Sequence, residues 1–218
     1  MMERIQRITK VERQKRSKHR YNIYLDEEYA FSVHEDIMIK HRLLKNEEVE
    51  ISRLQEIMLD EERQGAYLKA IKQIGIRPRS MHEVRQKLGR DGFEEETVND
   101  VIQRLVTEGY LNDLEFAKLF IEHRTLYQKK GRHYIRQELI QKGLSSEQIG
   151  RALEELDKES ELEGAMALAR KQWRTTSGEI PDKKRKTMAY LLRRGYPSSI
   201  VHQAVNRVME EIQSETGE

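Results

Sequence analysis

The sequence predicts a mostly α-helical protein of tandem three-helix repeats, which form an elongated curved array behind a small N-terminal sheet. An apolar pattern with a period of 51 or 52 residues is the first observation behind this prediction. The second is a strand-like alternation near the N-terminus. The third is a composition of 37% hydrophobic and 36% charged residues, which favours several small cores over one large core.

The repeated pattern begins in the second of three helices in each copy. The first copy contains Val84, Leu88, Gly92, Phe93, Val98, Ile102 and Leu105. Each position recurs 51 residues later as an apolar residue or glycine, from Ile135 to Leu156, and again after 52 more residues, up to Val208. In the third copy the first position is Thr187, a polar residue. Such a period is typical of stacked supersecondary units, which offer long surfaces rather than one deep pocket.

The N-terminal segment predicts a sheet. Residues 21–25 and 29–33 alternate with period two, which is typical of a hairpin, and residues 5–16 can supply another strand. We expect strands only within the first ~35 residues, with the sheet packed against a helix. Residues 36–41 predict a short helix, and Ser52 with Gln55 predicts a capping box that opens a long helix reaching Ile74.

Glycines and caps divide each copy into helices. Gly92, Gly143 and Gly195 occupy equivalent positions and predict left-handed helix C-caps. Ser80 is expected to cap the second helix of the first copy, and Ser145 or Ser146 the third helix of the second copy. The predicted segments are 1–52 for the strand-containing part, 53–108, 109–160 and 161–212 for the repeats, and 213–218 for a tail.

The second helix of every copy is basic. Charge is segregated along the chain, since residues 1–24 contain eight Lys or Arg against two Glu, and residues 183–194 contain six basic residues and no acid. A basic stripe along stacked repeats suits phosphate groups or an acidic protein groove, although solvation of an exposed helix also explains such runs. The candidate partner-binding or DNA-binding residues are Arg79, Arg85, Lys130, Arg132, Arg136, Lys183, Lys184, Arg185 and Arg193.

No catalytic apparatus is legible in the sequence. The chain has no cysteine, and its seven histidines show no metal-ligand spacing, so we expect no metal or other cofactor. Phosphate-binding loops are absent. His133 and Arg136 with Tyr190 superficially resemble the catalytic residues of tyrosine recombinases, but the repeat explains these positions better. Neither a membrane span nor a secretory signal is evident, so we expect a cytoplasmic protein.

Three motifs resemble a known family. RPRSMHEVRQKL (77–88), GYLNDLEFAKLF (109–120) and KGRHYIRQELIQKGL (130–144) are similar to the RecX family of bacterial regulators of the recombinase RecA, in its longer, Gram-positive form. The resemblance covers about residues 60–210. It implies a non-enzymatic protein that binds in the groove of the RecA–DNA filament. There it is expected to regulate filament assembly, ATP hydrolysis and strand exchange, and so the SOS response. We expect the protein to be a monomer. Direct contact with single- or double-stranded DNA is also implied.

Two other hypotheses remain open on sequence grounds. A helical DNA-binding protein could use one repeat as a helix-turn-helix, but such a protein needs one specialised recognition helix, whereas the basic bias here extends over all three copies. A recombinase-like enzyme would need a tyrosine nucleophile and an arginine pair in one pocket. The repeat makes that arrangement improbable.

Overall fold

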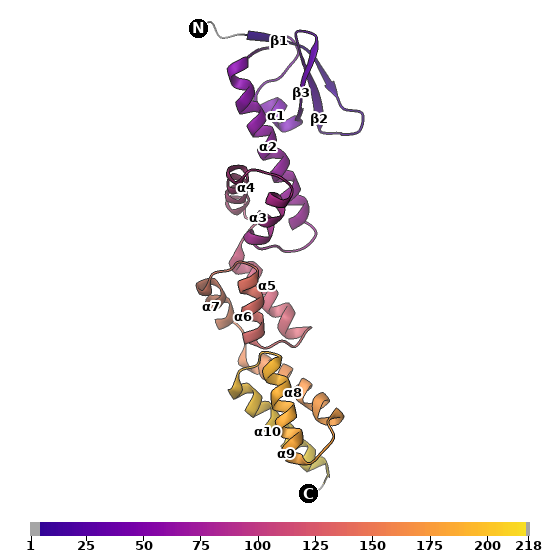
Figure 1. Ribbon diagram of the computed structural model, residues 1–218, viewed down its shortest axis with the longest axis vertical. Coiled ribbons are helices and arrows are strands. Elements are labelled where there is room, and N and C mark those ends of the chain that lie inside the picture. Colours follow the sequence, from indigo (N-terminus) through magenta and orange to yellow (C-terminus); the bar gives the residue numbers. More distant parts are fainter. Residues whose placement is uncertain (1–4, 217–218) are drawn as a thin grey trace. The chain divides into compact units, whose positions relative to one another are not determined.

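The computed structural model describes residues 5–216, and the order of their elements is shown in Figure 1. The chain divides into two compact units. The first runs up to Arg79 and includes Val84–Leu111; the second consists of Ser80–Glu83 and the chain from Asn112 onward. Helix α3 (Met81–Arg90) therefore begins in the second unit and continues in the first.

Four antiparallel strands form the N-terminal sheet in the order β3-β2-β1-β4. They are β1 (Ile5–Arg13), β2 (Arg20–Leu25), β3 (Glu28–His34) and β4 (Glu48–Glu50). The predicted hairpin and the additional strand are thus confirmed. The restriction of strands to the first ~35 residues is wrong, because β4 pairs with the start of β1 through Ile5 and Glu50. A three-residue strand is too short to show alternation, although its Val49 is buried.

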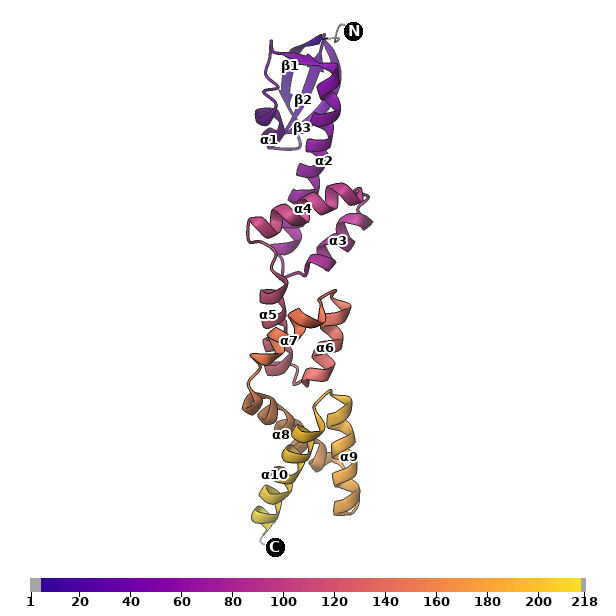
Figure 2. The same ribbon diagram turned by 90° about the vertical axis from the view of Figure 1, so that its left-hand side faces the viewer.

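Helices α1 (Glu35–Lys40) and α2 (Ile51–Ile74) complete the core of the first unit on one face of this sheet (Figure 2). Ile8, Ile23 and Val33 of the strands pack with Ile37 of α1 and Ile57 of α2. The predicted capping box at Ser52 is wrong. Strand β4 leads directly into α2, so the N-cap is Glu50, whose side chain makes no capping hydrogen bond.

The remaining chain is helical, as predicted, and forms tandem three-helix domains. The first group is α2, α3 and α4 (Glu95–Thr107). The second is α5 (Asp113–Leu126), α6 (Arg132–Gln141) and α7 (Ser146–Glu154). The third is α8 (Lys158–Thr175), α9 (Ile180–Arg193) and α10 (Ser198–Thr216). The repeat positions that begin each pattern are all fully buried: Val84, Leu88, Ile135, Leu139, Thr187 and Leu191. In the described helices, none is both long and apolar enough to cross a membrane.

The three equivalent glycines end the second helices with one geometry. Gly92, Gly143 and Gly195 have φ of +90°, +82° and +87°, which a side chain would strain. The following backbone N–H, for example that of Leu144, donates to a carbonyl five residues earlier at 3.2 to 3.3 Å in all three copies. This pattern confirms the predicted left-handed caps. The caps at Ser80 and Ser145 are also confirmed, each with a reciprocal bond to the residue three positions later.

Candidate binding surface on the helical repeats

The second helix of each group, α3, α6 and α9, contains most of the predicted binding residues. Arg79, just before α3, and Arg85 on α3 belong to the first unit, and the other seven belong to the second. Their side chains differ in what they contact. Some point to solvent, whereas others are engaged in bonds that hold the fold together.

Arg132 is the most deeply engaged of them. Its Nη2 lies 2.7 Å and its Nε 2.8 Å from Oε2 of Glu161, while its backbone N–H donates to Oε1 of the same carboxylate at 3.0 Å. Glu161 is 0% exposed. A buried carboxylate needs a charged partner and hydrogen bonds, because its desolvation is otherwise very costly. The structure therefore gives Arg132 a structural role that the sequence analysis missed.

An equivalent contact occurs at the start of α3. Met81, which precedes Arg132 by 51 positions, donates its backbone N–H to Oδ1 of Asp113 at 2.9 Å. Asp113 is buried, and burial raises the pKa of its carboxyl. In both cases an acid in the first turn of the next first helix accepts the N–H at the start of a second helix. Sequence reasoning reads such acids only as favourable to the helix dipole.

The loops beside these contacts approach each other closely. The backbone N–H of Gly131 donates to the carbonyl of Arg194 at 3.0 Å, and that of His133 donates to the carbonyl of Gly195 at 3.0 Å. A Cβ at Gly131 would lie 2.3 Å from backbone atoms of Gly195 and of Tyr196. Glycine is therefore required at position 131 by backbone proximity rather than by a positive φ.

Arg85 and Arg136 occupy equivalent positions in the first two copies of the sequence repeat, and both are exposed. Arg85 donates to Oδ1 of Asn99 on α4. The residue equivalent to Asn99 in the second copy is Gly150, which offers no side-chain acceptor, so the Arg136 guanidinium cannot make this bond. Position 188 in the third copy is Met188, and the predicted arginine stripe thus covers two copies at this position.

The other predicted residues fall into two classes. Lys130 places Nζ 3.6 Å from the centroid of the Tyr134 ring, and Arg79 is half-buried with its Nε unbonded within the described chain. The rest are on α9 and face solvent fully or in part: Lys183, Lys184, Arg185 and Arg193. Of these, Arg185 forms an exposed pair with Asp182 at 3.2 Å.

The recombinase-like residues have structural explanations. His133 and Arg136 are on α6, and the repeat places His82 and Arg85 at the corresponding positions of α3, so both residues belong to the repeated pattern. Tyr190 packs against the core of the third group.

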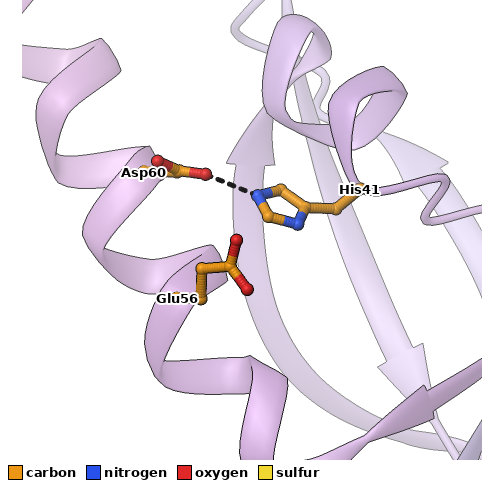
Figure 3. Close-up of side chains that lie close together, drawn as sticks. All are labelled: His41, Glu56 and Asp60. Atoms are coloured by element: carbon orange, nitrogen blue, oxygen red, sulfur yellow. Dashed lines mark hydrogen bonds and ion pairs between the residues drawn. The ribbon is translucent and has the colours of Figure 1, made fainter.

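Three possible metal ligands lie together in the first unit (Figure 3). His41 Nε2 is 2.7 Å from Oδ2 of Asp60, and Glu56, one turn earlier on α2, approaches within 4.8 Å. Lys40 Nζ also lies 2.6 Å from the same Asp60 oxygen, so an ammonium already neutralises this carboxylate. We interpret the cluster as a buried polar link between α1 and α2. The absence of a metal site remains a prediction.

Models of known protein families match this chain segment by segment, first at the N-terminal sheet and then at each of the three helical groups. The RecX N-terminal domain model matches residues 6–50, and models of the first, second and third three-helix domains of RecX match residues 66–105, 112–153 and 159–205. Regulatory protein RecX of Bacillus cytotoxicus is 34% identical over 209 residues, covering 94% of this chain and 77% of the relative. This chain belongs to the RecX family.

Further comparisons with RecX proteins agree with this assignment. RecX of Bacillus thuringiensis is likewise 34% identical over 209 residues, again covering 94% of this chain and 77% of that protein. A crystal structure of regulatory protein RecX matches with a TM-score of 0.79 at 30% identity, covering 93% of this chain and 99% of the other. The RecX structure from Lactobacillus salivarius has a TM-score of 0.65 at 21% identity, with 68% and 97% coverage, and supports the fold.

Proposed function

We propose that this protein regulates a RecA recombinase by binding in the groove of the RecA–DNA filament. There it changes filament assembly, ATP hydrolysis and strand exchange, and thereby recombination and the SOS response. Membership in a family of regulatory proteins supports the regulatory role. The proposal places the protein in the cytoplasm with its partner, acting as a monomer and without an enzymatic activity of its own.

One observation supports this proposal most directly. Exposed Arg85 and Arg136 occupy the same position in successive copies, and within residues 5–216 no buried acid forms an ion pair with either of them. A filament presents the same groove surface once per protomer. Repeated weak contacts along such a surface act together, because each bound repeat raises the effective concentration of the next. We keep the division into segments 53–108, 109–160 and 161–212 as part of this proposal.

The test is co-sedimentation with RecA filaments assembled on single-stranded DNA. The double variant Arg85→Glu/Arg136→Glu should bind at least tenfold more weakly, since each reversed contact costs on the order of 1 to 3 kcal/mol. The loss should be larger at low than at high salt. Arg132 is left unchanged because its removal would damage the fold.

The matched control is Arg53→Glu/Arg174→Glu, which reverses one exposed arginine in each unit outside the second helices. This control should bind like the unmodified protein. Unchanged binding of the Arg85/Arg136 variant would show that another face contacts the filament. Equal binding to bare duplex DNA, without RecA, would instead favour a helix-turn-helix DNA-binding protein.

A further inference from the structure

The outer face of the N-terminal sheet has a chemistry that the helical repeats lack. Strand register pairs Lys10 of β1 with Tyr24 of β2, and Tyr24 with Tyr29 of β3, so these three form one row across the sheet. The opposite face holds the buried core residues, including Ile23. The row therefore faces away from the core of the unit.

Two tyrosine rings are available on this face. The rings of Tyr24 and Tyr29 pack edge to face with centroids 5.9 Å apart, and Tyr29 is 59% exposed. Lys10 Nζ lies 5.0 Å from the centroid of the Tyr24 ring. Exposed aromatic rings on a sheet beside a cation are the groups on which unpaired bases stack in single-strand-binding proteins.

Hydrogen-bonding side chains fill the adjacent rows. Gln14 Nε2 donates to Oδ1 of Asn22 at 2.9 Å, and Ser32 Oγ donates to the same oxygen at 2.8 Å. Glu12 is the only acid between positions 4 and 25, and Lys10 at 3.0 Å and the Tyr24 hydroxyl at 3.2 Å both donate to it. The charge of this carboxylate is thus offset locally, whereas three exposed acids of the β2–β3 turn and the start of β3 directly precede Tyr29: Asp26, Glu27 and Glu28.

The turn between β1 and β2 adds positive charge at one end of these two strands. Gln14, which reaches across to Asn22, fixes the start of the turn against the sheet. The last residue of β1 and the turn that follows it expose four cations: Arg13, Lys15, Arg16 and Lys18. The next cation, Arg20, is occupied by an ion pair with Glu61 at 2.7 Å. The four exposed cations can follow a phosphate backbone that crosses the sheet.

We propose that this outer face binds single-stranded nucleic acid. Bases stack on Tyr29 and Tyr24, and phosphates contact Lys10 and the basic turn. An acidic protein segment would be attracted by the cations but would not need the exposed ring of Tyr29 and the half-buried ring of Tyr24, and duplex DNA hides the faces of its bases. The site lies in the first unit, outside the helical repeats, and does not depend on RecA binding.

The test measures binding of a fluorescently labelled 15-nucleotide oligothymidylate to the full chain by anisotropy, without RecA. Tyr29→Ala should weaken binding about tenfold through the loss of stacking, while Tyr29→Phe, which keeps the ring, should bind nearly normally. Lys15→Glu/Arg16→Glu/Lys18→Glu should weaken binding further and make the dependence of log Kd on log salt shallower by about 2.

Matched controls are available elsewhere in the chain. Tyr127→Ala removes another exposed tyrosine, and Lys158→Glu/Lys171→Glu/Arg174→Glu makes an equal change in net charge on α8. Both controls, and Arg85→Glu/Arg136→Glu, should retain oligonucleotide binding. Normal binding by Tyr29→Ala would overturn the proposal, whether or not the charge variant binds. Equal affinity for a hairpin duplex of the same length would also overturn it.

Discussion

Arg132 and Glu161 form an ion pair across 2.7 Å in which the carboxylate is fully buried. The same carboxylate accepts the backbone N–H of Arg132, so it holds the start of α6 against the first turns of α8. An arginine that looks like part of a basic binding stripe in the sequence is therefore a structural residue. Mutations of this pair are therefore expected to change stability, whereas mutations of the exposed arginines are expected to change partner binding.

The first prediction concerns this pair. Arg132→Ala should lower the free energy of unfolding of the second unit by about 3 to 5 kcal/mol, because it leaves Glu161 buried and unpaired. Arg132→Met with Glu161→Gln should recover much of the loss, since glutamine is uncharged and still accepts the N–H. Urea unfolding followed by the fluorescence of the single tryptophan, Trp173, reports on this unit.

Arg136→Ala is the matched control, because Arg136 is exposed one turn further along the same helix. Its unfolding midpoint should stay within experimental error of the unmodified protein. If Arg132→Ala were equally harmless, the buried pair would have no net stabilising role.

The fold could be predicted from the sequence because its signals are local or recur with a nearly constant period. Leu88, Leu139 and Leu191 recur after 51 and then 52 residues, and each is followed four residues later by the glycine that ends its helix. Both signals depend only on helix geometry and on the conformational freedom of glycine. The short strand at Val49 was missed because its pairing with β1 is a tertiary contact, with no alternation to indicate it.

The candidate site was less predictable, for the same reason. Arg132 and Arg136 are both basic residues on one helix, and nothing local distinguishes them. Their difference arises from Glu161, which is 29 residues away and belongs to the next repeat. Until the packing of the repeats is known, Glu161 cannot be told apart from a solvated acid in the first turn of a helix. Arg85 and Arg136 are likewise alike in the local sequence. Their hydrogen bonding differs because their equivalent neighbours are Asn99 and Gly150.

The second prediction concerns the polar departure from the repeat. Thr187 is 0% exposed, and its Oγ1 has no hydrogen-bond partner within the described chain. The equivalent residues Val84 and Ile135 are apolar. Thr187→Val keeps the shape and removes the unbonded hydroxyl, so it should stabilise the protein by about 1 kcal/mol. A shift of the Trp173 unfolding midpoint to lower urea would contradict this prediction; Thr187→Ser, which keeps the hydroxyl and removes a methyl group, should be destabilising.

The third prediction concerns acid stability of the first unit. Burial raises the pKa of Asp60, but hydrogen bonds from Lys40 and His41 outweigh it and hold that pKa below its usual value. The folded pKa is depressed, so the resulting stability is present above the unfolded value of about 3.9 and is lost as pH falls through the folded pKa. The stability gap between unmodified protein and Asp60→Asn, measured by thermal melting, should therefore shrink below about pH 4. A gap that is constant from pH 7 to pH 3 would contradict the mechanism.

Asp113 should behave in the opposite way. Burial raises the pKa of its carboxyl despite the hydrogen bond from Met81, so stability associated with this group is present below the unfolded pKa and is lost as pH rises through the folded pKa. Asp113→Asn keeps an acceptor for the Met81 N–H and avoids the buried charge. It should be as stable as the unmodified protein at acidic pH and more stable at pH 7, as judged by thermal melting. Lower stability at pH 7 would indicate that the charged hydrogen bond outweighs desolvation.

The last prediction compares two glycines of the second unit. Gly131 is buried, and a Cβ there would lie 2.3 Å from backbone atoms that cannot move independently of the cap at Gly195. Gly131→Ala must therefore push the two loops apart and break the bonds to the carbonyls of Arg194 and Gly195, at a cost of several times the ~1 kcal/mol assigned to one hydrogen bond.

Gly150 is within α7, and a Cβ there meets nothing within 4 Å. Gly150→Ala should therefore stabilise the protein by about 0.5 to 1 kcal/mol, because alanine loses less conformational freedom in a helix. Urea unfolding of both variants should thus shift in opposite directions, and a shift in the same direction would show that the close approach at Gly131 does not limit packing in solution.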